Sequence, residues 1–238
     1  MLLIKLAFRN LLRNRRRTLI TSAAIVFGMA LMHFTICMQH GAYSAMINTG
    51  IGSMAGHVVV QGQGYEASGD TSIVVENAER VAAKLEEAVS YKGIVLQRSF
   101  LGGLLTSADG SSAAMVSAVE PEKDREVGKF HDYLHEGEWL ESSKDILLGV
   151  GLAETLDVEL GDKLVYMMQV DDEMASKLFR VKGLLRTGAA DQDGVMAAIS
   201  VEAAKELRGG ADHSTQVAMI LEDFTQWPEA LAQGRDGL

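Results

Sequence analysis

The sequence predicts an α+β protein with one N-terminal transmembrane helix, followed by a mixed α/β domain on the far side of the membrane. Three observations predict this fold. The 238-residue chain has a net charge of −10, but residues 1–17 sum to +6 and all later residues to −16. None of residues 18–65 is formally charged. Beyond them, segments with helical periodicity are interleaved with segments typical of strands and hairpins.

Residues 1–17 form a basic segment that we expect to lie in the cytoplasm. Lys5, Arg9 and Arg13 recur every four residues, so that in a helix they share one face, with leucines between them. Such an amphipathic helix would lie on the anionic cytoplasmic leaflet. An ordinary basic flank that follows the positive-inside rule is equally compatible with the sequence.

The next segment, Thr18–Met38, is the predicted transmembrane helix. It has 21 residues, of which 15 are apolar and none is Asp, Glu, Lys or Arg. As a helix it would span roughly 30 Å, the thickness of the hydrocarbon core of a bilayer. Because Arg13, Arg15, Arg16 and Arg17 precede it, the positive-inside rule places the N-terminus in the cytoplasm and exports the later residues.

A cleaved signal peptide is the rival interpretation of this segment, since Ala42-Tyr43-Ser44 offers a small-x-small cleavage site. The apolar run is longer than the about 7–15 residues of a signal-peptide core, which favours an uncleaved anchor. Within the span, Ala24 and Gly28 form a small-xxx-small pair. Such a pair lets a second transmembrane helix approach closely.

After the span, the helix is expected to extend to about residue 55 before a domain with helices and strands begins. Residues 94–190 are richer in strands than their flanks, which suggests two subdomains. The expected elements, in chain order, are a strand at 57–61, a helix from an Asn77 cap to about 89, strands at 94–107 and 112–119 around an Asp-Gly turn, a strand at 145–148, a helix at 152–156, strands at 163–170 and 178–186 around a polar connection at 171–177, a strand at 195–199, a helix from a Ser200 cap to 207, a strand at 216–221 and a last helix that Trp227-Pro228 opens.

Several classes of function are disfavoured by the sequence. The acidic bulk of the chain would repel phosphates, which argues against nucleic-acid binding. The single cysteine, Cys37, excludes an intramolecular disulfide and any cysteine-based zinc or iron–sulfur site within one chain. P-loop, nucleophile-elbow and dinucleotide-binding motifs are all missing. We therefore expect no catalytic residues and no bound cofactor, and predict that the protein is not an enzyme.

Two clusters could in principle hold a metal ion. His131 and His135 are four residues apart, and on a helix their imidazoles would share a face. A solvated charged loop is the favoured interpretation of this segment. Asp191 and Asp193 lie in a glycine-containing turn where calcium could bind, but a polar turn is favoured there as well. No metal site is therefore expected.

Four stretches, in the same order, resemble one family of membrane proteins. They are LAFRNLLRNRRRTLIT (6–21), GAYSAMINTGIGSMAGHVVVQGQGY (41–65), ILLGVGLAETLDVELGDKLVYM (146–167) and FRVKGLLRTGAADQDGVMAAISVEAAKEL (179–207). They resemble permeases of the MacB/FtsX-like ABC transporter class, including the lipoprotein-releasing LolC/LolE type. Together they place the resemblance on residues 1–222.

The resemblance implies a first transmembrane helix and a MacB-like periplasmic core domain with a porter-like and a more β-rich subdomain. The implied domains are a cytoplasmic segment at 1–17, the span at 18–38, the core domain at 56–222 and a connection toward further membrane helices at 223–238. It also implies the bacterial inner membrane as location. The implied partners are the lipid bilayer, a separate ABC ATPase subunit that binds ATP, a second permease copy or paralogue, and a lipoprotein substrate or periplasmic partner.

The sequence departs from the family in one respect. Typical members have three more membrane helices after the periplasmic domain, and this sequence does not show them. In the family, the helix that contacts the ATPase lies in that later part. The leading hypothesis is thus the N-terminal part of a permease that couples ATP hydrolysis by a partner to release or export of a substrate. The alternative is a single-span, membrane-anchored periplasmic binding or scaffold module without transport activity.

Replacing Arg15, Arg16 and Arg17 together by glutamate tests the predicted topology. The substitution removes the positive charge that holds the N-terminal flank in the cytoplasm, so we expect disturbed or inverted insertion. Reporter fusions on either side of the span measure the orientation. An unchanged orientation would contradict the assignment.

Overall fold

The computed structural model describes residues 13–53, 56–68, 73–127, 129–170, 173–221, 223 and 226–237. The expected amphipathic helix with Lys5 and Arg9 lies outside these residues. The chain divides into two compact units, Met1–Thr49 and Gly50–Leu238. Each unit is described by itself below.

The first unit consists mainly of α2 (Arg15–Ser53), a single helix of 39 residues. Its stretch Arg15–Gly41 is long and apolar enough to cross a membrane, and none of its most apolar window is buried by protein. The Thr21 and Thr35 hydroxyls each donate to the carbonyl four residues earlier, at 2.9 Å. Because these hydroxyls are satisfied within the helix, their transfer into hydrocarbon costs less.

The second unit is built on a mixed sheet with the strand order β1-β11-β3-β4-β9-β6-β8-β5, in which β7 also pairs with β3 and β8. A separate pair joins β2 to β10. The strands are β1 (Val58–Gln61), β2 (Val75–Glu76), β3 (Gly93–Thr106), β4 (Ser111–Val119), β5 (Leu134–Gly137), β6 (Asp145–Gly149), β7 (Lys163–Val170), β8 (Glu173–Leu185), β9 (Met196–Ser200), β10 (His213–Ser214) and β11 (Gln216–Leu221).

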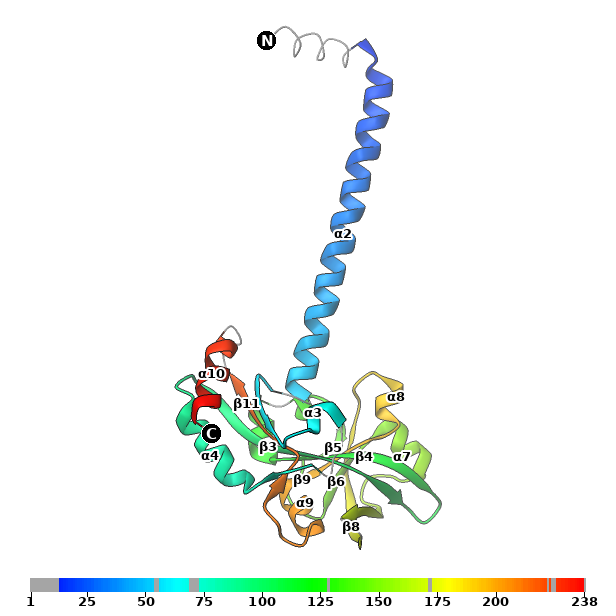
Figure 1. The fold of residues 1–238 in the computed structure, drawn as a ribbon. Coiled ribbons are helices and arrows are strands. Elements are labelled where there is room, and N and C mark those ends of the chain that lie inside the picture. Colours follow the sequence, from blue (N-terminus) through cyan, green and yellow to red (C-terminus); the bar gives the residue numbers. More distant parts are fainter. Residues whose placement is uncertain are drawn as a thin grey trace. The chain divides into compact units, whose positions relative to one another are not determined.

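Short helices cover this sheet. Figure 1 shows α4 and α10 side by side at one end of the domain, and α7 and α8 at the other. The helices of this unit are α3 (Tyr65–Ser68), α4 (Ala78–Ala88), α5 (Pro121–Val127), α6 (Lys129–Asp132), α7 (Val150–Leu156), α8 (Ala190–Asp193), α9 (Val201–Leu207) and α10 (Trp227–Gly237). The predicted Ser200 cap is confirmed, because its hydroxyl accepts a hydrogen bond from the Ala203 amide at 3.2 Å.

The domain contains three hydrophobic clusters, and the two largest separate two lobes. The porter-like lobe contains α4, α10, β1, β11 and the first half of β3, and its core includes Leu85, Val95 and Met219. The β-rich lobe contains the second half of β3 and the strands from β4 to β9, and its core includes Leu105 and Tyr166. β3 therefore belongs to both lobes.

One predicted connection is a strand. Residues 171–177 were expected to form a polar loop, yet β8 begins at Glu173. Its first residues pair with β7, for example Lys177 with Tyr166 and Ala175 with Met168. Exposed and half-buried residues alternate at this end of β8, with Met174, Ser176 and Leu178 exposed and Ala175 and Lys177 half-buried. Composition alone indicated a loop, and pairing with β7 outweighs that composition.

The sheet is tightly packed where β3 meets β7. A Cβ atom on Gly103 would lie 2.4 Å from the Met167 carbonyl oxygen and 2.6 Å from the Tyr166 ring. Tyr166 is fully buried, and its hydroxyl donates to the Leu101 carbonyl at 3.1 Å. Burial raises the pKa of Tyr166, so the hydroxyl stays a donor at neutral pH. Gly103 is therefore required by a close approach of backbone and ring.

Gly103→Val should lower the free energy of unfolding by about 1–3 kcal/mol, because the new side chain overpacks the Tyr166 ring. Gly102→Val is the matched control, since a Cβ atom at Gly102 meets nothing within 4 Å. Urea titration of the full chain in detergent measures both. Equal losses for the two variants would show that the close approach at Gly103 does not limit packing.

Candidate functional site: the junction between the two lobes

The predicted topology residues lie at the start of the first unit. Arg13, Arg15, Arg16 and Arg17 are all exposed, and the last three belong to the first turn of α2. Ala24 and Gly28, one turn apart on α2, are also exposed, and nothing lies within 4 Å of a Cβ atom placed on Gly28. A second helix could therefore approach this face closely. Its use as a packing face remains a prediction.

The considered histidine pair does not share a helix. His131 lies in α6 and His135 in β5, so the four-residue spacing does not place their imidazoles on one face. His131 instead packs edge-on against Trp139, with ring centroids 5.2 Å apart. Among the described residues, no group of three or more His, Cys, Asp or Glu side chains could hold a metal ion.

Asp193, the other considered ligand, is buried and satisfied by a turn. Its Oδ1 accepts the Thr187 amide at 2.8 Å and the Thr187 hydroxyl at 2.7 Å. Asp191 is exposed in α8. These hydrogen bonds agree with a polar turn.

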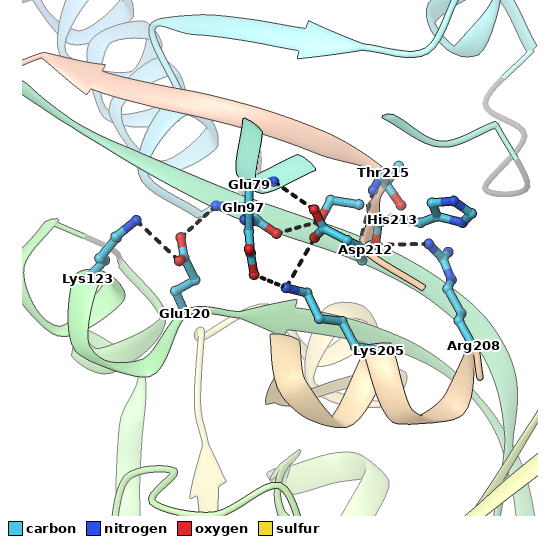
Figure 2. Close-up of polar contacts among 11 residues, drawn as sticks. Glu79, Gln97, Glu120, Lys123, Lys205, Arg208, Asp212, His213 and Thr215 are labelled. Carbon is cyan, nitrogen blue, oxygen red and sulfur yellow. Dashed lines mark hydrogen bonds and ion pairs between the residues drawn. The ribbon is translucent and has the colours of Figure 1, made fainter. Parts of the chain in front are cut away.

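The densest polar cluster of the described domain lies where the two lobes meet (Figure 2). It begins at α4, whose predicted cap Asn77 occupies the N-cap position but makes no side-chain capping bond, because its backbone is left-handed with φ at 52°. Asp212, which precedes β10, caps the helix instead. Its backbone carbonyl accepts the Ala78 amide at 3.2 Å and its Oδ2 accepts the Glu79 amide at 3.0 Å. A residue distant in sequence thus caps the helix.

Lys205 ties α9 of the β-rich lobe to this cap. Its Nζ lies 2.6 Å from Glu79 Oε1 and 3.1 Å from Asp212 Oδ1. Burial lowers the pKa of Lys205, but hydrogen bonds and charge attraction from the two carboxylates outweigh burial and leave the pKa above its usual value. The ammonium group is therefore charged at neutral pH and joins helices from both lobes.

Beneath this ion pair, β3 meets the β10–β11 strand segment through buried hydroxyl groups. Ser214 Oγ donates to Gln97 Oε1 at 3.1 Å, and the Thr215 amide donates to Ser99 Oγ at 3.2 Å. The Phe100 amide donates to Thr215 Oγ1 at 3.1 Å. Short hydroxyl side chains replace regular ladder bonds at the place where β3 passes from one core into the other, and they satisfy its polar groups there.

The opposite edge of β3 is covered by charged side chains from the β4–α5 connection. Glu120 Oε2 accepts the Gln97 amide at 2.8 Å, and Lys123 Nζ donates to the Val95 carbonyl at 2.9 Å. Glu120 and Lys123 also form an ion pair with each other at 3.2 Å. These two side chains take the place of a neighbouring strand along this part of β3.

A buried ion pair fixes α5 to β3 beside this edge. Arg98 Nη2 lies 3.2 Å from Asp124 Oδ2, both side chains are 1% exposed, and the guanidinium lies over the Phe130 ring at 5.8 Å. Burial raises the pKa of Asp124, and the charge of Arg98 partly opposes that rise. Because each charge has lost its water, removing one partner alone would be strongly destabilising.

The start of β1 carries a further polar contact. His57 Nδ1 accepts the Leu221 amide at 3.0 Å, and the His57 amide donates to the Met219 carbonyl at 2.8 Å. Burial lowers the pKa of His57, which favours the neutral imidazole that can accept this bond. The bond ties the residue just before β1 to the end of β11.

The chemistry of this junction is that of a mechanical connection. It contains ion pairs, hydroxyl bridges and a shared strand, without an aligned nucleophile and base. Sequence reasoning missed it, because its members come from five separate segments and each looks like an ordinary surface residue. The only local indication was Asp212, which lies in the turn before a strand. Its position in the sequence does not indicate that it caps α4.

Comparison with known proteins gives a consistent picture. The model of the MacB-like periplasmic core domain family matches residues 18–235. The lipoprotein-releasing system transmembrane protein LolC of Neisseria meningitidis serogroup B is 28% identical over 127 residues, which cover 49% of this chain and 31% of LolC. The chain therefore spans about a third of the length of that relative.

Two solved structures share the fold. The extracellular domain of the noncanonic ABC-type transporter YknZ from Gram-positive bacteria matches with a TM-score of 0.50 and 11% identity, over 72% of this chain and 86% of that one. The periplasmic region of MacB from Actinobacillus actinomycetemcomitans matches with a TM-score of 0.50 and 16% identity, over 69% and 73%. With the family match over most of the chain, these findings show that the protein belongs to the MacB-like periplasmic core domain family of ABC transporter permeases.

Proposed function

We propose that this chain is the N-terminal part of a permease subunit that couples ATP hydrolysis by a separate ATPase to release or export of a substrate outside the membrane. One observation carries the proposal. The family match begins at the membrane-spanning segment and runs through the whole extracytoplasmic domain, and α2 continues as one helix to Ser53, four residues before His57. In this proposal, motion of the span is passed toward the domain along α2.

The finer parts of the proposal follow from the family and the charge pattern. The chain lies in the bacterial inner membrane with its basic N-terminus in the cytoplasm and its main domain in the periplasm. A second permease copy or paralogue packs against α2 along the Ala24–Gly28 face. ATP is bound by the partner subunit, and the chain itself performs no catalysis. Lipoproteins are the proposed substrate, on the likeness to LolC.

Within the domain, the junction between the lobes is the proposed route of transmission. β1 follows the membrane helix and pairs with β11, and β11 pairs with β3, which enters the β-rich lobe. Lys205 forms a second connection, between α9 and α4. Both routes end in the β-rich lobe, which is therefore the proposed site of contact with substrate or partner.

A single-span binding or scaffold module is the second candidate. The two proposals differ in whether the native protein associates with an ATPase, and that difference decides the first experiment.

Affinity purification of the tagged native protein from crosslinked membranes tests the transport proposal. We expect an ATPase with a Walker-A motif to co-purify and to hydrolyse ATP. The control replaces residues 1–41 by a cleavable signal peptide, which exports the domain without its anchor and should lose the ATPase. If the intact protein also brings down no ATPase, the transport proposal fails and the binding module remains.

Lys205→Met tests the connection between α9 and α4. We expect a loss of about 0.5–1 kcal/mol in the free energy of unfolding, because the ion pairs are partly exposed and screened by solvent. Lys84→Met is the matched control, since Lys84 is an exposed lysine on α4. Urea titration of the full chain in detergent measures both variants, and equal losses would contradict a structural role for the junction lysine.

The same pair of variants gives a pH dependence. The pKa of Lys205 is raised in the folded protein, so its stabilising contribution is complete below the ordinary lysine value of 10.5 and is lost as the pH rises through the folded value above it. The stability difference between Lys205→Met and the unchanged protein should thus be constant from about pH 7 to 9 and shrink above the ordinary lysine pKa. A difference that vanishes already at pH 9 would show that the ammonium group is not held by its carboxylates.

A further inference from the structure

The strands of the β-rich lobe pair in a closed ring. β3 pairs with β4 and β7, β9 pairs with β4 and β6, and β8 pairs with β6 and β7. The second half of β3 and these other strands therefore form a small barrel, whose interior holds the buried side chains of Leu105, Tyr166 and Phe179. Because side chains alternate along a strand, the residues next to these three point to the outside of the barrel.

The outer wall of the barrel is covered over one part and exposed over another. Over β6 and β9, Phe130 and Trp139 pack on Leu147 and Ala198 in a further apolar cluster. On the adjoining wall, formed by β4, β3, β7 and β8, the outward apolar side chains are exposed or half-buried instead. They are Leu104, Met115, Val165, Met167, Met174 and Leu178, and together they are called the barrel patch below.

The register of the strands makes the barrel patch continuous. Leu104 lies opposite Met167, and Val165 lies opposite Leu178, which is 53% exposed. Met115 lies opposite Gly102, where a Cβ atom would meet nothing within 4 Å. Contiguous apolar surface on a domain surrounded by water marks an interaction site. The three methionines suit such a site, because their flexible side chains adapt to a partner.

The two ends of the patch carry charges of opposite sign. Lys163 and Arg180 lie opposite each other where β7 begins, and both are exposed. Glu173 lies opposite Val170 at the other end of the β7–β8 hairpin and is also exposed. Among the described residues, none of these three charged groups forms an ion pair. The two ends are roughly 24 Å apart at about 3.4 Å per residue of strand, so they cannot pair within one chain.

This charge pattern is complementary to itself. When two copies stack through the barrel patch about a two-fold axis, the basic end of each copy lies against the acidic end of the other. The apolar side chains between the ends are then buried, and each charged end gains an opposite charge. An anionic lipid surface would attract the basic end alone, and it would repel Glu173 and the net charge of −16 carried by the residues after 17.

We propose that the barrel patch is a contact surface for a second copy of this chain. The β7–β8 hairpins of the two copies pack antiparallel, so that Lys163 and Arg180 of one copy face Glu173 of the other. This inference goes beyond the proposed function and does not rest on it, because the contact lies within the extracytoplasmic domain and needs no ATPase.

Crosslinking of the full chain in bacterial membranes tests the contact. Ser176 is exposed midway along the hairpin, opposite Met167, so in a two-fold dimer it lies near the axis and faces its own counterpart. A bismaleimide with a span of about 10 Å matches the distance between stacked sheets. In a Cys37→Ser background we expect Ser176→Cys to give a crosslinked dimer. Asp191→Cys, at an exposed residue of α8, is the control and should give none.

Charge reversal identifies the partner as a second copy. Arg180→Glu and Glu173→Arg each place like charges together at both ends of the interface, so each should lower the dimer yield of Ser176→Cys at least about fivefold. The double variant restores opposite charges only between two copies and should recover the yield to within about twofold. Arg186→Glu reverses an exposed arginine just beyond β8 and should leave the yield unchanged.

The same experiment shows which outcomes overturn the proposal. Equal dimer yields for Ser176→Cys and Asp191→Cys would show random collision. A double variant that does not recover, although its urea midpoint is unchanged, would rule out the antiparallel contact. A crosslinked product with a different protein, in place of the dimer, would assign the patch to that protein. Quenching of a bimane label on Ser176→Cys by brominated lipids would assign it to the bilayer.

Discussion

The fold depends on one strand that serves two hydrophobic cores. β3 has 14 residues, with Val95 in the core of the porter-like lobe and Leu101 and Leu105 in that of the β-rich lobe. At about 3.3 Å per residue it extends for roughly 46 Å. The two lobes share this strand as one continuous backbone, paired with β11 up to Arg98 and with β4 from Ser99 on. The two lobes are therefore joined more stiffly than two domains on a linker.

This constraint explains why the polar groups gather at the middle of β3. A strand that leaves one sheet neighbour and gains another has backbone groups that neither ladder satisfies, and burial makes unsatisfied groups costly. The Ser99 and Thr215 hydroxyls supply the missing bonds to backbone amides on one side, and Glu120 supplies one on the other. The junction is thus a consequence of sharing a strand.

Periodicity predicted most of the fold, because each element is amphipathic over its own length. The two long strands of the hairpin at 94–119, the Ser200-capped helix and the Gln216–Leu221 strand agree with the structure to within about one residue. The failures have separate causes. β8 begins within a polar stretch because its first residues pair with the end of β7, for example Glu173 with Val170. The cap of α4 comes from Asp212 rather than Asn77, and this partner is distant in the chain, so that local pattern cannot supply it.

The candidate site could not be predicted from the sequence, because its residues are distant from one another in the chain. The charge pattern nevertheless constrained the function. Two solvents act on this chain: α2 exposes apolar side chains such as Phe27 and Leu31 that only lipid would accept, while the acidic remainder requires water. A chain divided in this way must carry its extracytoplasmic domain on the membrane. Within that domain, β1 pairs with β11 and β11 pairs with β3, so the β1–β11–β3 ladder connects its first strand to the β-rich lobe.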